Sequence, residues 1–217
     1  MKRVTTFHGI ARDPKSLMFV LLILLNVFFA INSEAFFSLE NYFNMLKQSS
    51  MIIIVASAAT ILMMTGNFDL STGSNLALTG VVYTLLLSSG MAMLPSALIA
   101  LLCGTAVGVV NGTLVSRIEF PPFIATLGTM YVARGIALIL AGGSPVRGEK
   151  IPESITTLAR GYWMGVPIPI YFLVLFVAIF RVVERSSLFG KYAMTIGGNR
   201  NAAFYSGIPV GKIVFWN

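Results

Sequence analysis

The stretch MAMLPSALIALLCGTAVGVVNGTLVS, residues 91–116, contains no charged side chain. It is long enough for an α-helix to cross the hydrocarbon core of a bilayer, which takes about 20 apolar residues. An uninterrupted apolar segment of this length predicts a transmembrane helix. This segment, which is expected to lie in the lipid bilayer, is therefore the feature of the sequence that decides the fold.

The composition extends this interpretation to most of the chain. Hydrophobic residues make up 56% and charged residues 11% of the 217 residues, whereas soluble domains carry about 25% charged residues. Such a chain cannot cover a water-facing surface. The net charge of +7 does not indicate nucleic acid, because the basic residues lie between apolar runs and form no stripe interleaved with aromatics.

Six apolar segments predict the fold class, an all-α polytopic transmembrane helical bundle with a candidate broken helix near residues 66–73. The first and third segments are short for a span of about 17–25 residues. The boundary between the third and the fourth, at residues 88–90, is weakly marked. The expected spans are residues 17–31, 43–65, 74–89, 91–116, 123–141 and 164–183.

The positions of Lys and Arg predict the orientation. With the N-terminus cytoplasmic, ten basic residues fall in inner segments and four in outer ones, the bias expected of a membrane protein. We therefore expect a cytoplasmic tail at 1–16, a transmembrane domain at 17–183 and a cytoplasmic segment at 184–217 that ends as a further helix begins. Tyr162 and Trp163 are expected to anchor the outer end of the sixth helix. The inner set is Lys2, Arg3, Arg12, Lys15, Arg117, Arg181, Arg185, Lys191, Arg200 and Lys212, and the outer set is Lys47, Arg147, Lys150 and Arg160.

Catalytic and metal-binding patterns are missing from the sequence. Cys103 is the single cysteine and His8 the single histidine, so no Cys/His cluster can hold a metal. The chain contains no HExxH, G-x-S-x-G, paired intramembrane aspartates or G-x-x-x-x-G-K-[ST] phosphate loop. We expect no catalytic residue, no metal and no cofactor, and a protein that is not an enzyme.

A polar stretch, TGNFDLSTGS at residues 65–74, separates two apolar segments. Gly66 and Gly73 allow the backbone to leave helical geometry. Asp69, Ser71 or Thr72 can accept hydrogen bonds from the free N–H groups that open the next helix. Two interpretations stay open: a capped loop, or a broken helix whose exposed backbone lines a translocation path.

Further candidate residues lie inside the expected spans. Arg134 carries a charge whose burial in lipid costs on the order of 2.5–3.5 kcal/mol, so it should face the bundle interior as a structural clamp or as a substrate contact. Pairing with Asp69 is a further alternative. Gly104, Gly108 and Gly112 recur at four-residue spacing and predict close helix packing, with a gating hinge as the alternative.

The last segment predicts a short helix. Gly197-Gly198 breaks the chain, Asn199 can cap a helix, and Gly207 stops it after about two turns. A helix of this length is not stable alone in water. Its own bundle or a partner protein must hold it, unless the segment is a plain surface turn.

Four motifs in series resemble the ribose/xylose-type permeases of sugar ABC importers. The first is the glycine-flanked Asp-Leu-Ser stretch GNFDLSTGS at 66–74. The second and third are FIATL at 123–127 with Arg134-Gly135, and GSPV at 143–146. The fourth combines GKY at 190–192, GGN at 197–199, Ala202-Ala203 and SGI at 206–208. The resemblance runs from about residue 36 to residue 212.

This resemblance implies a permease subunit of a prokaryotic inner-membrane importer for a monosaccharide or similar small polar solute. The implied partners are a cytoplasmic ABC ATPase, which hydrolyses the ATP, a periplasmic or lipid-anchored solute-binding protein, and a second permease subunit, identical or different. It places Gly66, Asp69, Ser71 and Gly73 at the translocation path or broken helix. It assigns ATPase coupling to Gly197, Gly198, Asn199, Ala202, Ala203, Phe204 and Gly207.

The chain also departs from the family pattern. Phe68 and Thr72 stand where the family has aliphatic residues, and Arg200 and Asn201 where it more often has acidic or small ones. The resemblance implies further helices beyond residue 217, so we expect a truncated permease that does not transport alone. The alternatives are a secondary transporter or channel, for which Asp69 is the one ion-coupling candidate, and a non-functional fragment.

Overall fold

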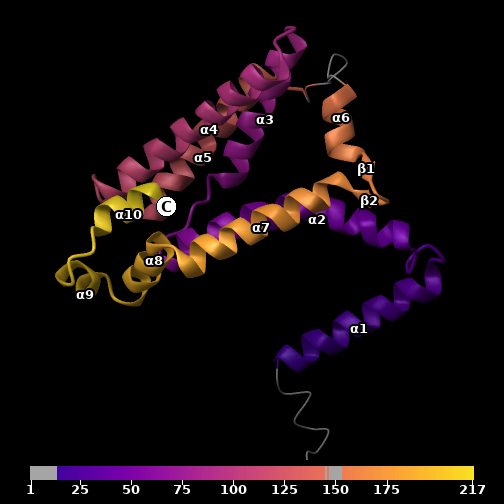
Figure 1. The fold of residues 1–217 in the computed structure, drawn as a ribbon, viewed down its shortest axis with the longest axis horizontal. Coiled ribbons are helices and arrows are strands. Elements are labelled where there is room, and N and C mark those ends of the chain that lie inside the picture. Colours follow the sequence, from indigo (N-terminus) through magenta and orange to yellow (C-terminus); the bar gives the residue numbers. More distant parts are fainter. Residues whose placement is uncertain (1–13, 145, 147–152) are drawn as a thin grey trace, which may run out of the picture. The chain divides into compact units, whose positions relative to one another are not determined.

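The computed structural model describes residues 14–144, 146 and 153–217. In these residues the regular secondary structure is helical apart from one short hairpin (Figure 1). His8 and most of the expected N-terminal tail lie outside the described residues, as do Arg147 and Lys150. The elements are α1 (Pro14–Asn32), α2 (Leu39–Met64), α3 (Thr72–Ser88), α4 (Met93–Ser116), α5 (Pro122–Leu140), α6 (Glu153–Arg160), β1 (Tyr162–Trp163), β2 (Val166–Pro167), α7 (Ile168–Ser186), α8 (Leu188–Gly198), α9 (Arg200–Tyr205) and α10 (Val210–Trp216).

The six expected spans correspond to α1 to α5 and α7, which confirms the all-α polytopic class. In the described part of the chain, α1, α2, α4 and α5 are long and apolar enough to cross a membrane. Helix α3 has 17 residues. Helix α7 carries Arg181, Glu184 and Arg185 near its C-terminal end.

The start of α7 corrects the sequence prediction, which began the sixth span at residue 164. Met164 and Gly165 both have positive φ, 49° and 78°, and form the turn between β1 and β2. The helix begins at Ile168, directly after Pro167 at its N-cap. A left-handed pair cannot continue a right-handed helix, so the apolar run divides into a hairpin and a helix. Helix α6 was not predicted from the sequence either.

The chain divides into two compact units, residues 1–48 and 49–217. In the first, α1 has no buried residue. A turn follows α1, and Ser38 caps the start of α2 by accepting a hydrogen bond from the backbone N–H of Asn41 at 3.2 Å. The exposed apolar side chains of α1 are consistent with a lipid-facing helix.

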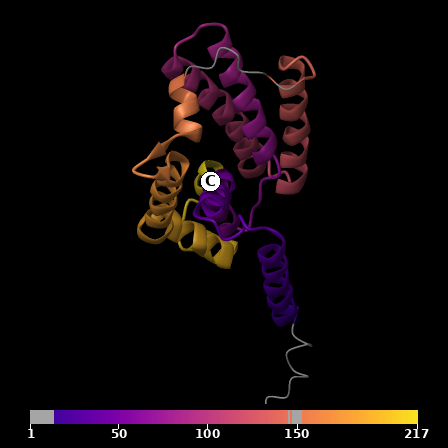
Figure 2. The same cartoon turned by 90° about the vertical axis from the view of Figure 1, so that its right-hand side faces the viewer.

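In the second unit, α3 packs against both α4 and α5, as the two views in Figures 1 and 2 show. Leu78, Ala133 and Ala137 form the buried core of this three-helix group, with Cys103 and Val107 of α4 packed against it. Small residues let the helix backbones approach closely. Few large side chains are needed to fill such an interface.

A second small core joins the last three helices. Ile196, Ala203, Val210 and Val214 are buried together, and Val115 at the end of α4 packs against them. Helix α10 lies against α4. The C-terminal segment is therefore held by its own bundle and by the end of α4.

Candidate functional site

Residues 65–71 form a non-helical connector between α2 and α3. Gly66 has a φ of +78°, which ends α2 in left-handed geometry. The carboxylate of Asp69 accepts a hydrogen bond from the backbone N–H of Ser71 at 2.6 Å, and its carbonyl accepts from the Thr72 hydroxyl at 3.2 Å. Asp69 therefore stabilises the turn into α3, and the side chain of Ser71 is left to bond elsewhere.

Two hydrogen bonds join the connector to α4 and α4 to α5. The Asn111 amide of α4 donates to the Ser71 hydroxyl oxygen at 2.8 Å, and the Thr129 hydroxyl of α5 donates to the Asn111 side-chain oxygen at 2.7 Å. Ser71 is fully buried and Asn111 is 7% exposed. We call these three residues the polar network; it fixes the connector against α4 and α5.

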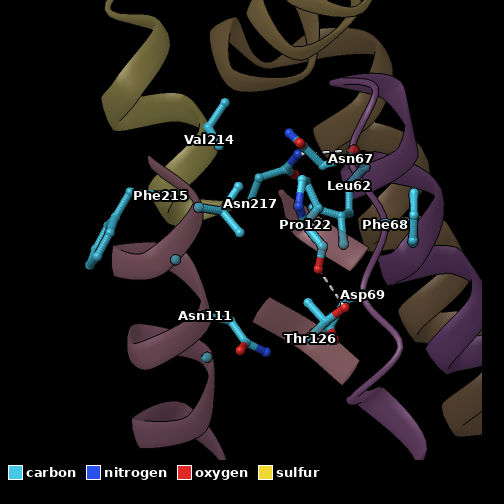
Figure 3. Close-up of a pocket in the computed structure, with 13 residues that line it drawn as sticks. Leu62, Asn67, Phe68, Asp69, Asn111, Pro122, Thr126, Val214, Phe215 and Asn217 are labelled. Atoms are coloured by element: carbon cyan, nitrogen blue, oxygen red, sulfur yellow. Dashed lines mark hydrogen bonds between the residues drawn. The ribbon is translucent and has the colours of Figure 1, made fainter. Parts of the chain in front are cut away.

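A cavity of about 100 Å³ lies beside the polar network (Figure 3). The connector contributes Asn67, Phe68 and Asp69 to its wall, α4 contributes Asn111, and α5 contributes Thr126. Amide, hydroxyl and carboxylate groups thus meet apolar side chains at one place. Such a lining can bind the hydroxyl groups of a small polar molecule.

The C-terminal segment contacts this connector directly. The side-chain amide of Asn217 donates to the carbonyl of Ile61 at 3.2 Å and to the hydroxyl oxygen of Thr65 at 3.0 Å. A Cβ atom added to Gly197 would overlap the carbonyl of Met64. Two groups of residues that the sequence singled out separately, the break and the tail, therefore lie together at the end of α2.

The three glycines of α4 face three different neighbours. A Cβ atom at Gly104 would lie 2.7 Å from the Thr79 methyl group of α3, and one at Gly112 would lie 2.7 Å from the Phe215 carbonyl of α10. Gly108 has open space there and lines the cavity. The sequence expected one smooth face against another helix; the structure divides that face between α3, the cavity and α10.

Arg134 contacts α3 through a hydrogen bond. Its side chain is exposed in the chain described, and its Nε donates to the hydroxyl oxygen of Ser74 at 3.3 Å. Within the described residues, Arg134 forms no ion pair with Asp69. Its observed partner is therefore a hydroxyl group of α3 and not the Asp69 carboxylate.

Helix α9 has the caps that the sequence predicted. The Asn199 side chain accepts from the backbone N–H of Ala202 at 2.9 Å. At the other end, Gly207 has a φ of +80°, its N–H donates to the Phe204 carbonyl at 3.0 Å, and that of Ile208 donates to the Ala203 carbonyl at 3.1 Å. This pair of bonds is a Schellman motif.

The faces of α9 differ in their surroundings. Ala203 is fully buried in the core of the C-terminal segment, whereas Phe204 is 66% and Tyr205 is 87% exposed. A Cβ atom at Gly198 would meet nothing within 4 Å. A partner that docks on α9 would therefore contact the two aromatic rings. Ala203 packs the opposite side of α9 against the core of the C-terminal segment.

Sequence reasoning missed the members of the polar network other than Ser71. Asn111 and Thr129 lie inside apolar spans that were assigned as plain helices. An amide within an apolar helix signals a polar partner, because lipid offers none. That signal marks the residue, but the partner depends on how α3, α4 and α5 pack.

The helical bundle and its buried polar network define the class: a multi-pass α-helical membrane protein with a polar interior at a broken segment. The chain belongs to the family described as branched-chain amino acid transport system / permease component, which matches residues 41–217. This match, together with the ribose import permeases among the relatives, confirms the family assignment made from the four motifs.

Individual relatives are sugar permeases by name. The chain is 35% identical over 204 residues to the ribose import permease protein RbsC of Escherichia coli, covering 93% of this chain and 63% of the relative. It is 32% identical over 197 residues to RbsC of Haemophilus influenzae, covering 90% and 61%. It is 32% identical over 199 residues to the D-allose transport system permease protein AlsC of Escherichia coli, covering 91% and 60%. The chain thus spans less than two thirds of the length of these relatives, and no solved structure matches it.

Proposed function

We propose that this chain is the membrane-spanning permease subunit of an ATP-driven importer that carries a monosaccharide or similar small polar solute into the cytoplasm. Family membership and the named sugar permeases support this proposal. The observation that carries it is the non-helical connector 65–71, whose polar side chains line a cavity together with Asn111 and Thr126. Hydroxyl and amide groups at an interruption of a transmembrane helix suit a solute rich in hydroxyls.

The volume of the cavity indicates the conformational state of the translocation path. Its volume of about 100 Å³ is smaller than the roughly 300–1,000 Å³ of pockets that hold small ligands. We infer that the path is closed at the connector in this conformation and that the connector moves when a solute passes. Gly66 and Gly73 are the proposed ends of the moving segment.

The energy for this movement is proposed to come from a separate cytoplasmic ATPase that docks on the C-terminal segment through α9. The solute would arrive from a periplasmic or lipid-anchored binding protein, and a second permease subunit would complete the path. The contacts of Gly197 and Asn217 with the end of α2 give the docking segment a direct mechanical link to the connector.

Replacing Phe204 with alanine is expected to weaken binding of the proposed ATPase partner by about 30-fold or more, because an exposed aromatic anchor contributes about 2 kcal/mol or more to an interface. The ring is 66% exposed, so its removal leaves the core of the segment intact. Co-purification and titration in detergent measure the affinity.

Leu188 offers a matched control, because it is 67% exposed and lies outside α9. Leu188→Ala should bind the ATPase as the native chain does. Equal binding by Phe204→Ala and the native chain would contradict the docking site. Failure of the native chain to bind the ATPase at all would overturn the proposed function.

The proposed orientation places Tyr205 on the cytoplasmic side and Glu153 on the opposite side. Because Cys103 is the single cysteine, Cys103→Ala provides a background for single-cysteine labelling. A membrane-impermeant maleimide should react with Tyr205→Cys in inverted vesicles only, and with Glu153→Cys in intact cells. Labelling of Tyr205→Cys from outside would reverse the topology.

A further inference from the structure

The hairpin formed by β1 and β2 lies at the junction of α6 and α7 (Figure 1). Met164 at its tip is 82% exposed, and the two residues before it, Tyr162 and Trp163, are 52% and 60% exposed. None of the proposed roles in transport or ATPase docking uses these side chains. A tip of three adjacent exposed apolar residues needs an apolar surface to cover it.

The backbone conformation at Met164 is unfavourable for methionine. Met164 and Gly165 form a two-residue turn with φ values of 49° and 78°, the arrangement of a type I′ turn. Asn-Gly is the preferred pair in such turns, and a long side chain without a local hydrogen-bonding group is uncommon at positive φ. The sequence thus places methionine where asparagine would relieve strain, which indicates a use for the apolar side chain.

The neighbouring contacts hold the hairpin in a defined position. The Tyr171 hydroxyl of α7 donates to the carbonyl of Trp163 at 3.0 Å, and the two rings meet edge to face with centroids 5.1 Å apart. A Cβ atom added to Gly161 would overlap the carbonyl of Thr157 in α6. The contacts of Trp163 therefore fix the tip to α7, while Gly161 closes the last turn of α6 just before β1 begins.

The position along the chain identifies the covering surface. Helix α7 corresponds to an expected transmembrane span, and it begins at Ile168, directly after β2. The hairpin consequently lies where the chain enters the bilayer. Trp and Tyr are enriched at that depth because their rings are apolar and their N–H and O–H groups remain hydrated. The exposed Arg160 at the end of α6 is suitably placed for a lipid phosphate.

We propose that the hairpin tip, Tyr162, Trp163 and Met164, inserts into the interfacial layer of the bilayer and sets the depth of α7. Its partner is the lipid surface, at the level of the glycerol backbone and the first acyl carbons. A solute-binding protein that docks on the same tip is the alternative, and the experiment must distinguish it from the lipid surface.

Trp163 serves as its own probe in a Trp216→Phe chain, because these are the two tryptophans of the sequence. The chain is reconstituted in phosphatidylcholine vesicles that carry bromine either close to the ester groups or near the ends of the acyl chains. We expect strong quenching of Trp163 by the shallow bromines, weak quenching by the deep ones and little quenching by aqueous iodide. Strong iodide quenching without bromine quenching would overturn the proposal, since the tip would then project into water.

A second variant separates insertion from folding. Met164→Asn creates the Asn-Gly pair that type I′ turns prefer, so the hairpin should fold at least as well. We expect quenching of Trp163 by the shallow bromines to fall by about half or more, because the tip loses its most exposed apolar group. Unchanged quenching would contradict the insertion of Met164. Tyr171→Phe removes only the hydroxyl contact and serves as the control for the position of the indole ring.

Discussion

Replacing Asn111 with leucine is expected to destabilise the bundle by about 1–3 kcal/mol. The change removes two hydrogen bonds, to Ser71 and from Thr129, and each bond between membrane helices is worth about 0.6–1.7 kcal/mol. Leucine also places a tetrahedral, apolar Cγ where a planar amide now lies among buried groups. Unfolding of the detergent-solubilised chain, followed by circular dichroism, measures the difference.

Thr105→Val provides the control on the same helix. The Thr105 hydroxyl donates to the Leu101 carbonyl of its own helix at 2.8 Å, and the residue is exposed. Its replacement should change stability by less than about 0.5 kcal/mol. Equal stability of Asn111→Leu and Thr105→Val would show that the polar network contributes nothing to the packing of α3, α4 and α5.

The substitution Gly197→Ala is expected to separate α8 from the end of α2, at a cost of about 1–3 kcal/mol for overpacking. A methyl group at residue 197 would overlap the carbonyl of Met64, which is backbone and cannot rotate away. The hydrogen bond from Asn217 to Ile61 should loosen with it. A lower melting temperature of the purified chain is the expected readout.

The adjacent glycine is the matched control for this prediction. A Cβ atom at Gly198 meets nothing within 4 Å, so Gly198→Ala should leave the melting temperature nearly unchanged. If the two alanine variants melt alike, the close approach between α8 and α2 does not contribute to stability.

Much of the fold could be predicted from the sequence because lipid imposes a simple pattern. An apolar helix must be long enough to cross, and proline or glycine marks its ends; α5 begins at Pro122 and α2 ends just before Gly66. The hairpin was missed because Tyr162 to Met164 are apolar and continue the hydropathy of the next helix. Only the left-handed turn at Met164-Gly165 divides them, and an apolar residue at positive φ has no sequence signature.

The candidate site was predictable only where a local pattern exists. Gly66, Asp69 and Ser71 stand in one short polar stretch, and Asn199 and Gly207 are cap residues at helix spacing. The bond from Asn111 to Ser71 joins residues 40 positions apart, so it depends on the packing of α3 and α4. The burial of Ala203 likewise follows from the fold of α8 to α10, which no local pattern shows.

Helix α4 takes part in both small cores, through Cys103 and Val107 in one and Val115 in the other. It also carries Asn111 between those two levels. A displaced C-terminal segment would therefore tilt α4 as a rigid rod about its contacts with α3. Such a tilt would move the Asn111 amide relative to Ser71. A shift at one end of α4 would then break a hydrogen bond in the interior of the helix without unfolding any of its turns.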